Sequence, residues 1–149
     1  MRAVVAQHAD IAGWLALAAE VEDMFESPMS TDADFARILR RNIDEGTAYV
    51  VHDSGADPKV IGAAIWRPGL RRIAWLAVAE DHRRSGVGAS LLSAIFEAAG
   101  PGSIVVETFG TDVPGGIPAR RFYEAAGFRR VGPVAEGAAP SSRDLFRRA

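Results

Sequence analysis

The stretch Val78-Ala-Glu-Asp-His-Arg-Arg-Ser-Gly-Val-Gly-Ala-Ser-Leu-Leu92 connects an apolar run to an amphipathic one. Residues 73–78, which lead into it, are apolar and suit a buried strand. Beyond the glycines, apolar side chains recur at helical spacing, at Val87, Leu91, Leu92, Ile95 and Phe96. The pattern predicts a strand that passes through a glycine-containing turn directly into a helix.

The turn has the composition of an anion site. It contains Arg83-x-x-Gly86-x-Gly88, with Arg84 beside the first arginine. Glycines at a helix start let an anion approach unpaired backbone N–H groups at the positive end of the helix dipole. The two arginines add fixed positive charge. We therefore expect a phosphate or pyrophosphate to bind at this turn.

A second segment, Pro118-Ala-Arg-Arg-Phe-Tyr-Glu-Ala-Ala-Gly-Phe128, reads as a short helix. Proline suits the first turn of a helix, where its missing N–H costs nothing. Gly127 is suited to the left-handed residue that ends it. Residues 103–108 form an apolar run of strand type between the two segments, interrupted only by Glu107 near its end.

Two common phosphate motifs do not fit the first segment. A P-loop needs a Gly-Lys-Ser/Thr ending, but the only lysine, Lys59, lies far upstream. A dinucleotide fingerprint needs a third glycine where Leu91 stands. Instead, the two segments resemble two motifs of the GNAT N-acetyltransferase superfamily, Gln/Arg-x-x-Gly-x-Gly/Ala and Ala-x-x-Phe/Leu-Tyr-x-x-x-Gly-Phe, in the family's order.

Hydrophobic periodicity along the chain predicts a single α/β domain over residues 1–149, with the element order β-α-α-β-β-β-α-β-α-β-β. This order is also that of GNAT domains. The resemblance implies a mixed, mostly antiparallel sheet of about seven strands flanked by about four helices. Residues 143–147 are expected to form a last strand near a sheet edge, which favours a homodimer because sheet edges pair readily.

The resemblance also assigns site residues. It places the pantetheine arm and thioester of acetyl-CoA on the backbone at the end of the strand that contains residues 73–78, and the pyrophosphate on the turn. Tyr123 matches a tyrosine that donates a proton to the departing thiolate in many family members. Glu107 is a candidate general base, with a salt bridge to an arginine as the alternative. The expected cofactor-binding residues are Leu76, Ala77, Val78, Arg83, Arg84, Ser85, Gly86, Val87, Gly88, Ala89 and Ala119.

One departure from the family pattern affects the site. Family members commonly carry an asparagine three residues before the alanine of the second motif, where this chain has Gly116. The acceptor pocket is less defined. Its candidate residues are Glu22, Asp23 and Glu26, which alternatively form a solvated helix end, and Met24, Phe25, Pro28 and Met29, of which Met24 and Phe25 alternatively complete the core.

Composition excludes several functions. The formal net charge of −2 gives no case for a nucleic-acid surface. The absence of cysteine excludes thiolate chemistry, and His8, His52 and His82 lack metal-ligand spacing, so no metal site is expected. No segment approaches membrane-spanning length, and a cytoplasmic protein is expected.

The resemblance therefore implies an acetyl-CoA-dependent N-acetyltransferase. The expected acceptor is a primary amine of a small molecule or peptide, reached by direct transfer through a tetrahedral intermediate. A water chain is an alternative to Glu107 as the base. The competing reading is a non-catalytic, acyl-CoA-binding module of the same fold that acts as a sensor or interaction domain.

Overall fold

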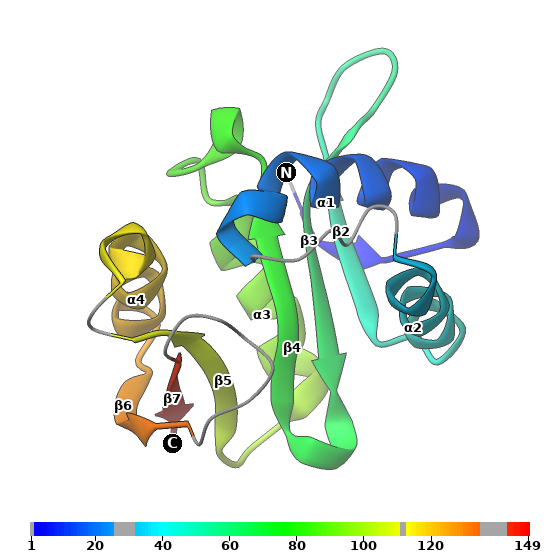
Figure 1. Ribbon diagram of the computed structural model, residues 1–149. Coiled ribbons are helices and arrows are strands. Elements are labelled where there is room, and N and C mark those ends of the chain that lie inside the picture. Colours follow the sequence, from blue (N-terminus) through cyan, green and yellow to red (C-terminus); the bar gives the residue numbers. More distant parts are fainter. Residues whose placement is uncertain (1, 26–31, 111–112, 135–142) are drawn as a thin grey trace.

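The computed structural model describes residues 2–25, 32–110, 113–134 and 143–149. Within these residues a seven-stranded sheet has the strand order β1-β2-β3-β4-β5-β7-β6 (Figure 1). The strands are β1 (Val4–Val5), β2 (Ala48–His52), β3 (Val60–Arg67), β4 (Arg72–Val78), β5 (Ile104–Phe109), β6 (Arg129–Pro133) and β7 (Arg143–Arg148). The α-helices are α1 (Ile11–Phe25), α2 (Ala33–Asp44), α3 (Val87–Ala99) and α4 (Ile117–Ala125). The predicted mixed, mostly antiparallel architecture is confirmed, because only β4 and β5 pair in parallel.

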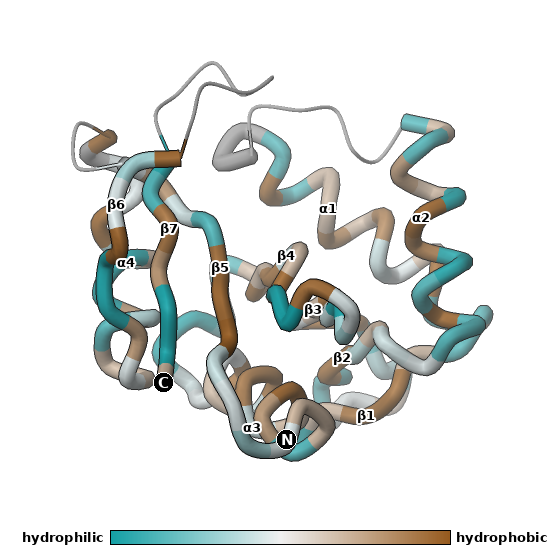
Figure 2. Tube along the Cα trace, turned by 90° about the horizontal axis from the view of Figure 1, so that it is seen from below, coloured by the Kyte–Doolittle hydropathy of each residue, from teal (hydrophilic) through white to brown (hydrophobic). Residues whose placement is uncertain are grey.

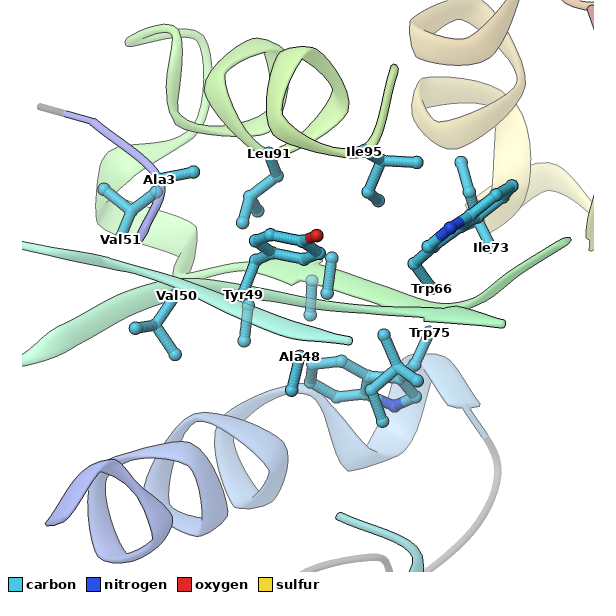
Figure 3. Packing of buried hydrophobic residues seen from close by; sticks show 14 of the residues in the cluster. Ala3, Ala48, Tyr49, Val50, Val51, Trp66, Ile73, Trp75, Leu91 and Ile95 are labelled. Carbon is cyan, nitrogen blue, oxygen red and sulfur yellow. The ribbon is translucent and has the colours of Figure 1, made fainter. Parts of the chain in front are cut away.

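Helices cover both faces of the sheet. Figure 2 shows α1 and α2 on one side of β2 to β4 and α3 on the other, while α4 lies beside β5 and β6. Side chains that alternate along the strands fill both layers. Figure 3 shows Tyr49 directed toward Leu91 and Ile95 of α3, whereas Val50 and Trp75 face α1. Burial of these apolar side chains on both faces provides the main driving force for folding.

A β-bulge changes the direction of side chains along β4. Trp66 of β3 pairs with Ile73, but its neighbour Ile65 pairs with Trp75, which leaves Ala74 as an extra residue. As a result Ile73 points to the α3 side and Trp75 to the α1 side, although only one residue separates them (Figure 3). Bulges leave no mark in the apolar pattern of a strand, so this one was not predicted.

β4 and β5 are paired only at their beginnings. The pairs are Arg72 with Val105 and Ile73 with Val106, and beyond them the two strands diverge (Figure 1). The edge of β4 that faces β5 therefore has no strand partner from Ala74 onward. This divergence opens a gap in the middle of the sheet, and the functional site described below lies there.

One local expectation needs correction. The final strand β7 lies between β5 and β6, so β6 rather than β7 forms that edge of the sheet. The reason is that β7 pairs with β5 along its whole length and still has a free edge for β6. The N-cap of α2 is Asp32, whose carboxylate accepts a hydrogen bond from the backbone N–H of Asp34 at 2.8 Å.

Candidate active site

A cavity of about 780 Å³ occupies the gap between β4 and β5. Its walls come from the end of β4, the turn that follows, the first turn of α3, the end of β5, and α4. Val21 of α1 also lines it, and α1 covers the opposite face of the sheet from α3. The cavity therefore reaches through the sheet from one layer of helices to the other.

Most of the predicted cofactor-binding residues line this cavity. They are Leu76, Ala77, Val78, Arg83, Arg84, Gly86, Gly88, Ala89 and Ala119. Ser85 and Val87 do not. The Ser85 hydroxyl donates to the carbonyl oxygen of His82 and closes the turn, and Val87 is a core residue with 1% of its surface exposed. The turn thus borders the cavity, while the side chains of Ser85 and Val87 stabilise the turn without lining the cavity.

The backbone of the turn is shaped to expose the start of α3. Arg84 and Gly86 both adopt positive φ angles, of 64° and 87°, and Gly86 is the N-cap without a side-chain cap. The first hydrogen bond of the helix joins the Ser90 N–H to the Gly86 carbonyl at 3.0 Å. The N–H groups of residues 87–89 precede that bond and have no acceptor within the helix. Together with the helix dipole, they form an anion-binding surface.

The charge of the lining matches that surface. Arg83, Arg84, Arg121 and His82 line the cavity, and none of the described lining residues is Asp or Glu. The Arg83 Nε also donates to the Val78 carbonyl at 3.4 Å, which ties the turn to the end of β4. The cavity therefore combines cationic side chains at the turn with an apolar wall along β4, a combination suited to a long ligand with a phosphorylated end.

Tyr123, the expected proton donor, lines the cavity. It lies on α4 with 7% of its surface exposed and makes an edge contact with Phe128, with ring centroids 5.5 Å apart. Burial raises the pKa of the Tyr123 phenol well above its ordinary value. The hydroxyl therefore stays protonated throughout the neutral range and is available as a proton donor.

Glu107 is not among the residues that line the cavity. Its carboxylate forms an ion pair with Arg72, the partner that sequence analysis left open as an alternative. Burial, and secondarily the nearby Arg67, lowers the pKa of the Arg72 guanidinium. The Glu107 side chain is 23% exposed and serves here to neutralise a half-buried cation. Tyr123 and the turn at residues 83–88 thus line the same cavity, whereas Glu107 does not line it.

The structure explains the glycine that departs from the family pattern. A Cβ built on Gly116 would lie 2.2 Å from the Cβ of Phe109 and 2.7 Å from its Cγ. Gly116 has an ordinary φ of −87°, so close packing rather than backbone conformation requires glycine. Phe109 occupies the space into which an asparagine side chain would project.

Sequence reasoning did not assign several lining residues to the site. These are Val21, Phe109, Gly115, Ile117, Pro118, Arg121 and Phe122. Val21 and Phe109 look like ordinary core residues in the pattern, and only the divergence of β4 and β5 exposes them to a cavity. Of the candidate acceptor residues, Glu26, Pro28 and Met29 lie outside the described residues, as do the side chains of Asp23, Met24 and Phe25. Glu22 lies on α1 and does not line the cavity.

Candidate metal-binding clusters and membrane-spanning helices are both absent from the described residues. No group of three or more His, Asp or Glu side chains in the described parts of the chain is arranged to hold a metal ion. Across the same residues, none of the helices is long and apolar enough to cross a bilayer.

Comparison with known proteins gives consistent results. A family model described as "Acetyltransferase (GNAT) domain" matches residues 44–130. A GNAT-family acetyltransferase from Bacillus cereus has a similar structure, with 17% identity, a TM-score of 0.77, and coverage of 98% of this chain and 94% of that chain. A ribosomal-protein-alanine N-acetyltransferase from Brucella melitensis has 18% identity and a TM-score of 0.75, and the match covers 99% of this chain and 99% of that chain. The GNAT-like decarboxylase GphF, in complex with isobutyryl-CoA, has 18% identity and a TM-score of 0.71, and the match covers 100% of this chain and 99% of that chain. No curated protein matches significantly.

The family model covers more than half of the chain, and the chain therefore belongs to the GNAT acetyltransferase family. Membership implies acyl transfer from an acyl-CoA. The three solved structures share the fold of this chain at 17% to 18% identity. The activity or ligand named for each of them is a property of that protein and is not transferred to this chain.

Proposed function

We propose that this protein is an N-acetyltransferase that moves the acetyl group of acetyl-CoA to a primary amine of a small molecule or peptide. The observation that carries the proposal is the cavity between β4 and β5. Unpaired amides and two arginines stand at one end of it, and a buried, protonated tyrosine lies on its wall. These features match the charged and reactive ends of a thioester of coenzyme A.

Residues 83–89 would hold the pyrophosphate, with the amides of residues 87–89 as donors and Arg83 and Arg84 as counter-charges. The edge of β4 from Leu76 to Val78 would hold the pantetheine arm, because β5 has diverged from β4 there and does not pair with it. Ala119 lies on α4 across the cavity and leaves room for the arm. The ligand would bind as an additional element that fills the gap in the sheet.

The acceptor nitrogen would attack the thioester carbonyl, so that a C–N bond forms and a tetrahedral intermediate results. Collapse of that intermediate breaks the C–S bond, and the Tyr123 hydroxyl gives its proton to the departing sulfur. The extra proton on the attacking nitrogen leaves through water as the amide forms, and an equivalent proton restores the Tyr123 hydroxyl. An alkyl amine has a pKa of about 10 and must lose a proton before it attacks. Since no carboxylate is among the described lining residues, we assign that proton to water, in place of Glu107.

Free-thiol release from acetyl-CoA, measured with a panel of small amines and amino-terminal peptides, tests the proposal. We expect thiol release that depends on one class of amine, together with the acetylated amine in equal amount by mass spectrometry. Binding of acetyl-CoA without turnover on any amine would favour the non-catalytic sensor instead. If acetyl-CoA does not bind at all, the site assignment is wrong.

A further inference from the structure

Phe109 of β5 lines the same cavity as the end of β4, which is the strand end expected to hold the thioester. The last residue pair between the diverging strands is Ile73 with Val106. Leu76 lies three residues beyond that pair on β4, and Phe109 lies three residues beyond it on β5. Both side chains line the cavity. The two side chains therefore line one cavity from the two strands that border the gap.

The Phe109 ring is held in place from several directions. Gly116 packs against its Cβ and Cγ so closely that a side chain there would overlap it. The guanidinium of Arg143 lies over the ring, 4.9 Å from the ring centroid to Cζ. The Phe109 carbonyl accepts a hydrogen bond from Arg120 at 2.8 Å. Phe109 is 8% exposed, and a ring fixed in this way cannot easily move aside for a larger ligand.

We infer that Phe109, seated on Gly116, limits the size of the acyl group that the cavity accepts. The inference rests on the proposed binding of an acyl-CoA in this gap. A fixed aromatic ring on the cavity wall, on the strand across the gap from the expected thioester, leaves room for an acetyl group and opposes a branched four-carbon group. One methylene in a shaped apolar pocket changes selectivity about 10- to 200-fold. Replacing phenylalanine by a smaller side chain should relax the limit by a similar factor.

The test compares dissociation constants of acetyl-CoA, isobutyryl-CoA and unacylated CoA by isothermal titration. The wild-type protein should bind acetyl-CoA at least about tenfold more tightly than isobutyryl-CoA. In Phe109→Ala that preference should fall about tenfold or more through tighter binding of isobutyryl-CoA, with the CoA constant unchanged. Phe109→Leu should give a smaller change in the same direction, and it provides the answer if the alanine variant does not fold.

Phe96→Leu is the matched control, because Phe96 packs against Phe128 and does not line the cavity. Its acyl preference should equal that of the wild type. An unchanged preference in folded Phe109 variants, or equal wild-type affinity for the two acyl-CoAs, overturns the inference. Binding is measured independently of turnover. If the protein binds both acyl-CoAs but transfers neither acyl group, the proposed enzyme activity is wrong, and the binding constants still test the role of Phe109. Failure to bind either acyl-CoA would overturn both proposals.

Discussion

Tyr123 lines the cavity and is buried, and its ring and its hydroxyl have different expected roles. The ring packs against Phe122 and Phe128, with centroid distances of 5.1 and 5.5 Å. The hydroxyl remains protonated because burial raises its pKa. Tyr123→Phe keeps the ring and removes the donor. We expect kcat to fall about 10²- to 10⁴-fold while the affinity for acetyl-CoA and the thermal midpoint stay near wild type.

Steady-state kinetics on a working acceptor, together with titration of acetyl-CoA, measures both quantities for this variant. A phenylalanine variant with nearly normal kcat would show that Tyr123 only packs and that water protonates the sulfur.

Gly88 has a second reason to lack a side chain besides the approach of an anion. A Cβ there would lie 2.8 and 2.9 Å from the Cε1 and Cζ atoms of Phe122 on α4. The family motif admits alanine at this position, but in this chain Phe122 blocks it. Gly88→Ala would push the ring into the cavity that both residues line. We expect acetyl-CoA to bind about tenfold more weakly, although alanine is the better helix former.

The double variant with Phe122→Leu separates this cause from others. A shorter side chain at 122 should restore most of the affinity lost in Gly88→Ala, a coupling of about 1 kcal/mol. Additive effects of the two substitutions would show that Gly88 acts on the ligand alone.

At the level of elements, one buried carboxylate joins α4 to the second half of the sheet. Asp144 of β7 is 3% exposed. It accepts hydrogen bonds from Arg130 of β6 at 2.8 and 3.1 Å and from Arg120 of α4 at 2.7 Å. Arg120 also donates to the carbonyl of Phe109. The network therefore fixes α4, which carries Tyr123, relative to the end of β5.

The same network predicts how stability depends on pH. Hydrogen bonds from Arg130, and then from Arg120, hold the pKa of Asp144 below its ordinary value, against the opposing effect of burial. A carboxylate with a depressed folded-state pKa stabilises the protein above its unfolded pKa of about 3.9, and that stability is lost as the pH falls through the folded value. Asp144→Asn should lower the free energy of unfolding by about 3 kcal/mol at neutral pH, since Arg120 loses its partner.

Urea denaturation over a range of pH values measures the free energy of unfolding of the wild type and of Asp144→Asn. The difference between wild type and Asp144→Asn should shrink below about pH 4. Glu45→Gln removes the partner of Arg41 in an exposed pair on α2 and should cost about 0.5 kcal/mol or less. A pH-independent difference for Asp144→Asn would contradict the assigned role of the charge.

Elements with a strong local signal were predictable from the sequence. The turn at residues 83–88 and the end of α4 just before Gly127 follow from glycine positions and apolar spacing, and Gly127 has a φ of 96°. The bulge at Ala74 and the position of β7 between β5 and β6 were not predictable. Both depend on which strands pair, and pairing partners distant in sequence leave no periodic signal. Phe109 was missed at the site for the same reason.

At the scale of the whole molecule, β1 and β6 are the outermost strands of the sheet formed by the described residues. Val4, Val5 and Val131 on these strands are between 45% and 49% exposed. The homodimer stays a prediction, and the edge available to it at this end of the sheet is β6 rather than β7. Light scattering should give twice the 15.9 kDa mass of the chain. A strict monomer at high concentration would contradict the prediction.

The central claim is that an acyl-CoA fills the gap between β4 and β5, with its pyrophosphate on the start of α3. Amide hydrogen exchange, measured with and without acetyl-CoA, tests it most directly because the proposed donors are backbone N–H groups. The amides of residues 87–89 precede the first hydrogen bond of α3 and should exchange rapidly in the free protein. Acetyl-CoA should slow them, along with residues 76–78, and leave α2 unchanged. Saturating acetyl-CoA that leaves residues 87–89 unprotected would contradict the account.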